Sequence, residues 1–135
     1  MRYLSLLFLA LFLCTCGPAQ PETDTHTDTE DTVDASACED LSPAEFAEKI
    51  GGPNTVLIDV RTPAETAGGG IPGALKMDYR SPEFKKNIGF LNSSKTYLLY
   101  CASGGRSAQA CGDLSALGFE KVYNLRGGYA AWENK

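Results

Sequence analysis

Short apolar segments alternate with helical patterns through residues 41–135, and this alternation is the feature that most limits the possible folds. The apolar segments cover residues 56–60, 97–100 and 121–125. Short runs of this kind are typical of strands that are buried on both faces of a parallel sheet. Because parallel neighbours require a crossover connection, the sequence predicts an α/β domain with one central, mostly parallel sheet of about five strands and helices on both faces.

Two segments carry the signature of a helix start. Ser42, Pro43 and Glu45 supply an N-cap residue, a proline at the first helical position and a capping-box acid. Residues 81–83 repeat Ser-Pro-Glu and predict a second helix start. A short strand is expected at 75–77, and a helix over 107–117 capped by Gly118. A last helix is expected from Gly127 to Trp132, with Tyr129 and Trp132 in the core.

Residues 1–15 have the pattern of an export signal. Arg2 precedes an apolar run over residues 3–13, which is shorter than the roughly 20 residues needed to cross a bilayer. Residues 13–17, Leu-Cys-Thr-Cys-Gly, resemble the lipobox of bacterial lipoproteins. We therefore expect Cys16 to be lipidated and to anchor the exported protein to a bacterial membrane at its periplasmic face. Plain secretion with cleavage after Ala19 is the alternative.

Residues 16–37 are expected to form an acidic, Thr-rich flexible tether, with the folded domain at 38–135. Residues 17–40 carry eight acidic side chains and no basic one. A segment of this composition cannot bury enough apolar surface to offset the entropy lost on ordering. The only histidine of the chain, His26, lies in this tether.

The charges and residue types of the domain exclude several functions. Residues 41–135 hold nine acidic and eleven basic side chains, which is far from the basic density of a nucleic-acid-binding protein. Without a histidine, this region cannot form a Ser/His/Asp triad, a Cys/His dyad or a histidine-ligated zinc site. No cysteine or acidic cluster has metal-ligand spacing, so neither a metal nor a cofactor is expected.

Cys101 is the candidate nucleophile, because it directly follows a predicted strand, where ligands bind in sheets of this type. Gly104 and Gly105 allow the loop backbone to curl around the sulfur, so that its amides and the next helix N-terminus stabilise an anion. Together with Arg106, this setting predicts a low thiol pKa. Arg106 would either bind an anion or support the loop from outside. A buried structural cysteine is the alternative for Cys101.

Two other cysteines lie in or next to the domain. Cys111 falls on the apolar face of the predicted helix and is expected to be a small buried side chain; a resolving thiol for Cys101 is the alternative. Cys38 lies at the junction between tether and domain. If Cys16 is lipidated, three cysteines remain in the tether and domain, and at least one of them must be unpaired because the number is odd. A disulfide that includes Cys38 is possible, but the sequence does not decide whether it forms.

Five motifs together resemble the rhodanese homology domain in its single-domain form. They are Leu-Ile-Asp-Val-Arg at 57–61 followed by Glu65, Ile-Pro-Gly-Ala at 71–74, the loop 101–107, Ala-Leu-Gly-Phe at 116–119 and Gly-Gly-Tyr-Ala-Ala-Trp at 127–132. The resemblance implies a sulfurtransferase in which Cys101 carries a persulfide. A small anionic donor such as thiosulfate would supply the sulfur, and cyanide, a thiol or a protein would accept it.

The resemblance also implies roles for individual residues. The loop amides from Ala102 through Ser103, Gly104 and Gly105 to Arg106 would hold the persulfide and the donor, with Asp59, Arg61 and Ser107 in support. An ion pair between Arg61 and Glu65 is an equally acceptable reading. The chain departs from many relatives in having Gly70 where they have histidine.

Two rival functions follow from the same loop. A cysteine-dependent phosphatase also places a cysteine, an amide cradle and an arginine before a helix, but has one residue more between cysteine and arginine than residues 102–105 provide. The shorter cradle favours sulfur over a phosphoryl group. A membrane-tethered persulfide carrier or redox partner of another protein would use Cys101 in the same way as the enzyme.

Overall fold

The computed structural model describes residues 38–135 of the chain. The predicted export signal (1–15), the tether (16–37) and the lipidation site Cys16 lie outside the described residues and stay predictions. No helix within residues 38–135 is long and apolar enough to cross a membrane.

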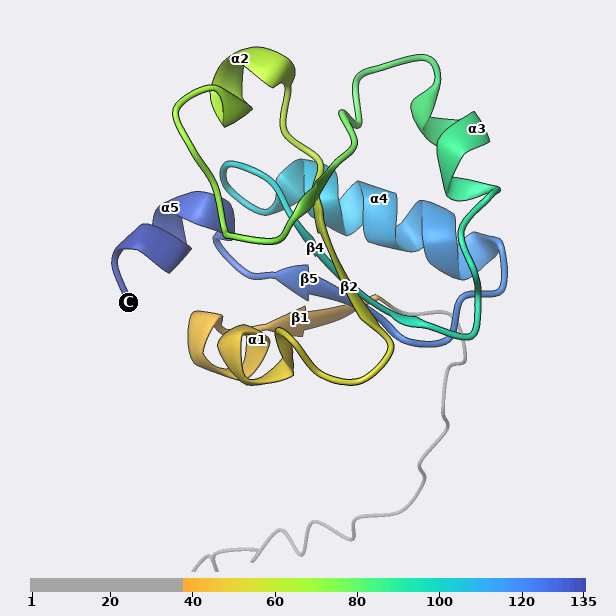
Figure 1. Ribbon diagram of the computed structural model, residues 1–135, viewed down its shortest axis with the longest axis horizontal. Coiled ribbons are helices and arrows are strands. Elements are labelled where there is room, and N and C mark those ends of the chain that lie inside the picture. Colours follow the sequence, from red (N-terminus) through yellow and green to blue (C-terminus); the bar gives the residue numbers. More distant parts are fainter. Residues whose placement is uncertain (1–37) are drawn as a thin grey trace, which may run out of the picture. The chain divides into compact units, whose positions relative to one another are not determined.

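The described residues form one five-stranded sheet with helices between the strands (Figure 1). All pairings are parallel and the strand order is β1-β5-β4-β2-β3, which confirms the predicted fold class. The elements are β1 (Glu39–Leu41), α1 (Pro43–Lys49), β2 (Thr55–Asp59), α2 (Pro63–Thr66), β3 (Leu75–Lys76), α3 (Phe84–Ile88), β4 (Thr96–Tyr100), α4 (Gly105–Ala116), β5 (Val122–Leu125) and α5 (Gly128–Glu133).

Two apolar clusters lie on opposite faces of this sheet, as the alternation along β4 shows. Tyr97 and Leu99 pack with residues of α3 and α4, whereas Leu98 and Tyr100 pack with residues of α1 and α5. Successive side chains of a strand point to opposite faces, so the central strand is buried on both. The prediction of helices on both faces is therefore confirmed.

The first two helices, α1 and α2, each start with an acid three residues after the cap residue. The capping box predicted at Ser42 and Glu45 is present: Glu45 Oε2 accepts a 2.9 Å hydrogen bond from the Ser42 amide. Thr62 and Glu65 form a second box and begin α2, which the sequence analysis missed although Thr-Pro-Ala-Glu carries the same signature. The helix predicted to start at 81–83 is present as α3, but it begins at Phe84, two residues later than a Ser81 cap would place it, and has no side-chain cap.

Other boundaries move by a few residues. Helix α4 begins at Gly105, two residues earlier than predicted, directly after Gly104 in the left-handed region at φ 98°. Its end at Ala116, followed by left-handed Gly118, is as predicted. Strand β1 was not predicted, because only Leu41 of its three residues is apolar; its pairing with β5 defines it.

A disulfide joins Cys38, just before β1, to Cys111 in α4. Cys111 is fully buried as expected, and it is the partner in the Cys38 disulfide that the sequence left open. The bond excludes a resolving role for Cys111 while it is intact. The two cysteines are 73 residues apart, a separation for which loop entropy corresponds to about 4 kcal/mol of stabilisation. Within residues 38–135, Cys101 is the only free cysteine.

Candidate active site around Cys101

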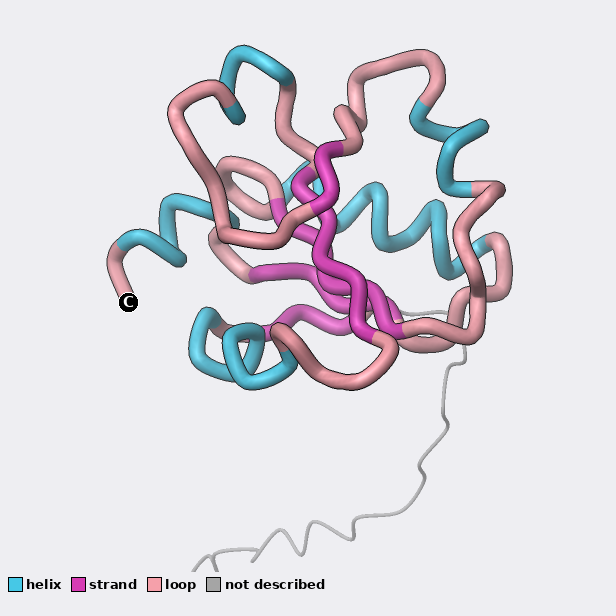
Figure 2. The backbone as a smooth tube through the Cα atoms, viewed as in Figure 1, coloured by secondary structure: helices cyan, strands magenta, loops and turns pink. Residues whose placement is uncertain are grey.

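Cys101 lies at the carboxyl end of the central strand. It follows Tyr100, the last residue of β4, and Tyr100 pairs with Asp59, the last residue of the neighbouring β2. The tube in Figure 2 shows the loop after β4 leading directly into the longest helix, α4. The cysteine is 1% exposed. Within residues 38–135 no group of three His, Cys, Asp or Glu side chains is placed to hold a metal ion.

Hydrogen-bond donors surround the Cys101 sulfur. The Gly104 amide donates to Sγ at 3.1 Å, and the amides of Ser103 and Ser107 also interact with the sulfur. The Ser107 hydroxyl lies near the sulfur as well and donates a 3.1 Å hydrogen bond to the Gly104 carbonyl. Burial raises the pKa of the Cys101 thiol, but these hydrogen bonds outweigh it, and the net pKa lies below that of an ordinary cysteine. The sulfur is thus buried but polar in its surroundings, which does not fit a merely structural cysteine.

The donor set differs in part from the one that the resemblance implied. Ser103 and Gly104 contact the sulfur as expected. Ser107, expected in a supporting role, has two contacts here: its amide, in the first turn of α4, interacts with the sulfur, and its hydroxyl donates to the Gly104 carbonyl of the loop. In the described part of the chain, the amides of Ala102, Gly105 and Arg106 donate no hydrogen bond to the thiol sulfur.

Residues 127–130 bind the backbone of the Cys101 loop through two hydrogen bonds. The Tyr129 amide donates to the Cys101 carbonyl at 2.7 Å, and the Ala130 amide donates to the Ala102 carbonyl at 3.1 Å. This approach requires Gly128, since a Cβ there would lie 2.6 Å from both the Cys101 carbonyl oxygen and the Ser103 nitrogen. The two glycines were predictable as a helix start, but their contact with the loop was not, because it joins segments far apart in the chain.

Arg106 pairs with Glu65, and its guanidinium also lies close enough to Cys101 to interact with the sulfur, so both alternatives for it stay open. Its Nη1 and Nη2 donate to Glu65 Oε2 and Oε1 at 2.8 and 2.6 Å. This pair, with the hydrogen bonds from the Thr62 amide and hydroxyl, holds the pKa of Glu65 well below its usual range. The pair therefore stabilises the fold above the pKa of an unfolded Glu and loses that contribution as the pH falls. Because the Glu65 side chain is 33% exposed, the contribution is screened and modest.

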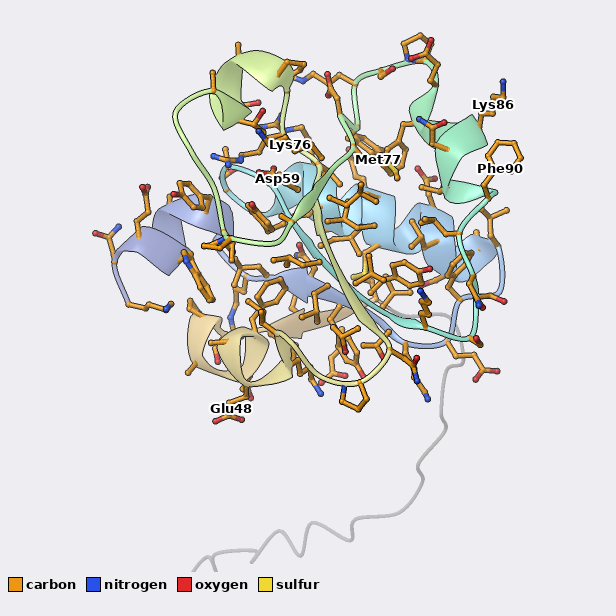
Figure 3. The ribbon with its side chains drawn as sticks, viewed as in Figure 1. Glu48, Asp59, Lys76, Met77, Lys86 and Phe90 are labelled. Atoms are coloured by element: carbon orange, nitrogen blue, oxygen red, sulfur yellow. A yellow bond between two sulfur atoms is a disulfide. The ribbon has the colours of Figure 1, made fainter. Side chains whose placement is uncertain are left out.

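Arg61 pairs with Asp59, so the reading that paired it with Glu65 was wrong. Arg61 Nε donates to Asp59 Oδ1 at 2.9 Å, and Nη2 donates to Asp59 Oδ2 at 2.7 Å and to the Gly69 carbonyl at 2.6 Å. Figure 3 labels Asp59 at the end of β2, close to the loops that follow the strands. Both side chains are buried, and they hold the segment around Gly69; their support of the Cys101 loop stays a prediction.

Tyr100 and Tyr129 complete this buried group. The Tyr100 hydroxyl accepts a 3.0 Å hydrogen bond from the Ile71 amide, and burial together with Asp59 raises its pKa. The Arg61 guanidinium lies over the Tyr129 ring, 4.3 Å from its centroid. Trp132 contacts Phe46 in the core, as expected. Tyr129 was expected to lie in the core only, but it also lines a cavity.

A cavity of 340 Å³ lies beside the Cys101 loop. It borders Ala102, the residue after the cysteine, and thus adjoins the loop. Its wall combines charged, aromatic and backbone surface, from Arg61, Glu65, Gly68, Gly69, Ala102, Tyr129, Ala130 and Glu133. The site therefore consists of a buried sulfur in a ring of donors, with a ligand-sized space next to it.

Known proteins are similar to this chain in sequence and in fold. A sulfurtransferase from Allochromatium vinosum is 40% identical over 79 residues, covering 58% of this chain and 72% of the relative. A tRNA uridine(34) hydroxylase from Rhizobium leguminosarum is 33% identical over 92 residues, covering 65% of this chain but 30% of the relative. The two names show that relatives of this domain serve different reactions.

A crystal structure of a rhodanese-related protein from Thermoplasma volcanium matches with a TM-score of 0.62 and 30% sequence identity. The match covers 71% of this chain and 91% of that one. Residues 42–135 match the family model of the rhodanese-like domain. On the strength of its sheet, its cysteine loop and these matches, the chain belongs to the rhodanese-like domain family.

Proposed function

We propose that the protein is a sulfurtransferase that moves sulfane sulfur through a persulfide on Cys101. The observation that carries the proposal is the free Cys101 sulfur with donors from Ser103, Gly104 and Ser107 directed at it. A thiolate held in this way needs no general base to act as a nucleophile. The relative named as a sulfurtransferase supports the same chemistry.

The first half-reaction uses thiosulfate as the donor. The Cys101 thiolate attacks the outer sulfur of thiosulfate, a sulfur–sulfur bond forms with Sγ, and the bond inside thiosulfate breaks. Sulfite leaves with the bonding electron pair, and the enzyme keeps a persulfide anion. Loop amides not used by the thiol are available to the added sulfur and to the donor oxygens, because successive amides in such loops point toward one concave site.

The second half-reaction returns the cysteine to its starting state. An acceptor such as cyanide attacks the outer sulfur of the persulfide, forming thiocyanate, and the electron pair of the broken bond returns to Sγ. No net oxidation occurs in this cycle, so it needs no cofactor. A carrier without general turnover would form the same persulfide, but it would pass the sulfur to one protein partner only.

Mass spectrometry of the protein after incubation with thiosulfate tests the proposal. We expect a mass gain of one sulfur atom on Cys101, an equal amount of sulfite, and loss of the added mass with thiocyanate formation when cyanide follows. The rate of persulfide formation should rise with pH to a plateau whose midpoint lies below the pKa of an ordinary cysteine, because the thiolate reacts.

The Ser107→Ala variant provides the internal comparison for this measurement. It removes a hydroxyl that lowers the Cys101 pKa and donates to the Gly104 carbonyl of the loop, so the midpoint should move to higher pH while the plateau persists. A persulfide that forms but discharges only to another protein would favour the carrier. No added sulfur with thiosulfate or any other sulfane donor would reject both.

We further propose that the protein is exported and lipidated on Cys16. The apolar run at 3–13 and the lipobox-like segment support this location. The Cys38–Cys111 disulfide adds an independent argument, because such bonds persist in oxidising compartments such as the periplasm.

Metabolic labelling with a radioactive fatty acid tests the anchor. The wild-type protein should take up label and sediment with membranes, and the Cys16→Ser variant should do neither. A Cys14→Ser variant is the matched control and should keep its label, since the expected cleavage precedes Cys16. Label retained by the Cys16→Ser variant would contradict the proposal.

A further inference from the structure

The Tyr100 hydroxyl joins two segments of the site that are far apart in the chain. Tyr100 is the last residue of β4 and directly precedes Cys101. Its side chain is fully buried, and its hydroxyl accepts a 3.0 Å hydrogen bond from the amide of Ile71, which lies 29 residues earlier. A side chain therefore ties the strand that carries the cysteine to the segment around Ile71.

The segment held in this way forms part of the cavity wall. Gly68 and Gly69 line the 340 Å³ cavity beside the cysteine loop. Residues 68–71 lie between α2 and β3 and belong to neither a helix nor a strand. Two side chains hold them: Arg61 donates to the Gly69 carbonyl, and the Tyr100 hydroxyl accepts from the Ile71 amide. The position of the wall therefore depends on Arg61 and Tyr100.

Gly70 leaves room for the hydroxyl. A Cβ at position 70 would lie 2.7 Å from Arg61 Nη2, 2.9 Å from the Tyr100 hydroxyl and 3.1 Å from Asp59 Oδ2. Gly70 does not have a positive φ, so its backbone conformation is open to alanine and the restriction comes from this crowding. The three surrounding side chains are buried, and shifting them would break the hydrogen bonds that they make. The Tyr100 hydroxyl thus occupies space that a side chain at position 70 would fill.

This contact is separate from the contacts that lower the pKa of the thiol. The donors to the sulfur belong to the cysteine loop and the first turn of α4. Tyr100 packs in the apolar cluster on one face of the sheet, and Cys101 packs in the cluster on the other face. Burial and Asp59 raise the pKa of Tyr100, so its hydroxyl stays protonated while the thiol titrates. An effect of this hydroxyl is therefore expected on substrate binding and not on the ionisation of the sulfur.

We propose that the Tyr100 hydroxyl is a positioning group for the sulfurtransferase reaction: it holds the wall at residues 68–71 beside the Cys101 loop and thereby lowers the KM for thiosulfate. The inference rests on the proposed function and adds a residue on which donor binding depends. The hydroxyl forms and breaks no covalent bond in either half-reaction. It acts through the glycine wall, on the cavity that also borders Ala102.

The Tyr100→Phe variant of the full chain removes the hydroxyl and keeps the ring. The Ile71 amide loses its acceptor, so we expect it to exchange with solvent at least about tenfold faster, as measured by NMR. The KM for thiosulfate should rise about three- to tenfold, the size of effect that one lost hydrogen bond produces. The kcat and the pH midpoint of persulfide formation should stay unchanged, because the donors to the sulfur are intact.

The Tyr97→Phe variant is the matched control. Tyr97 lies on the same strand, is 1% exposed and donates through its hydroxyl to the Asn92 carbonyl at 2.9 Å, but it packs on the opposite face of the sheet from Tyr100. Both variants should lose similar stability in urea, whereas only Tyr100→Phe should change the Ile71 exchange and the KM. An unchanged KM in Tyr100→Phe, an equal rise in Tyr97→Phe or a shifted pH midpoint would overturn the inference.

The Gly70→Ala variant tests the same contact from the other side. In the wild-type background it should raise the KM, because the new Cβ displaces the Tyr100 hydroxyl. In the Tyr100→Phe background the further rise should be smaller, since the hydroxyl is already gone. Additive effects would assign the two residues to separate contacts and overturn the inference. If Ile71 exchanges faster in Tyr100→Phe but even the wild-type protein transfers no sulfur, the proposed function fails and the contact between hydroxyl and wall stands.

Discussion

The Cys101→Ser variant is expected to lose sulfurtransferase turnover by at least about 10³-fold while keeping its fold. A serine hydroxyl stays protonated at the pH where the cysteine is a thiolate, and an oxygen in place of Sγ cannot carry a persulfide. The hydroxyl is close in size to the thiol and can accept the hydrogen bond from Gly104. Thiocyanate formation from thiosulfate and cyanide measures the loss, and circular dichroism with thermal unfolding checks the fold.

The remaining cysteines serve as the control for this experiment. A Cys38→Ser/Cys111→Ser double variant removes the disulfide and leaves Cys101 in place. It should still acquire a persulfide at a temperature where it is folded. Equal turnover in the Cys101→Ser and wild-type proteins would contradict the assignment of Cys101. If Cys38 or Cys111 carried the sulfur instead, the double variant would lose its turnover.

The Gly128→Ala variant is expected to lose about 2–5 kcal/mol of stability and to displace the catalytic loop. Gly128 has φ 62°, a left-handed conformation that costs other residues roughly 1–2 kcal/mol. The added Cβ would also lie 2.6 Å from the Cys101 carbonyl oxygen and the Ser103 nitrogen, and relieving such overpacking typically costs about 1–3 kcal/mol. Urea unfolding measures the stability, and persulfide formation with thiosulfate reports on the loop.

The Gly112→Ala variant is the matched control for Gly128→Ala. Gly112 lies within α4, is exposed, and has nothing within 4 Å of the position of an added Cβ. The same substitution there should stabilise the protein by about 0.5–1 kcal/mol, because alanine favours a helix interior over glycine. If Gly128→Ala unfolds at the same urea concentration as the wild-type protein, the close approach of residues 127–130 to the loop does not constrain the site.

The candidate site was predictable where it depends on one stretch of chain. Cys101 follows an apolar strand and precedes glycines and a helix, and the local rules for such a turn are sufficient to predict a low thiol pKa. The partners of Arg61 and Arg106 were not predictable in this way. From the sequence, each arginine could have paired with more than one carboxylate or with a bound anion. Only the packing of α2 against the loop pairs Arg106 with Glu65.

The sequence by itself determined the α/β class, the capped start of α1, and the cysteine loop with its glycines. These features follow from the spacing of apolar residues and from the conformations that Ser, Pro and Gly favour, which act over a few residues. Only the tertiary structure decided the Cys38–Cys111 bond, the Arg61–Asp59 pair and the contact of residues 127–130 with the loop. Each of these joins side chains or backbone groups whose distance and orientation depend on how the strands pair and the helices pack, which no local pattern specifies.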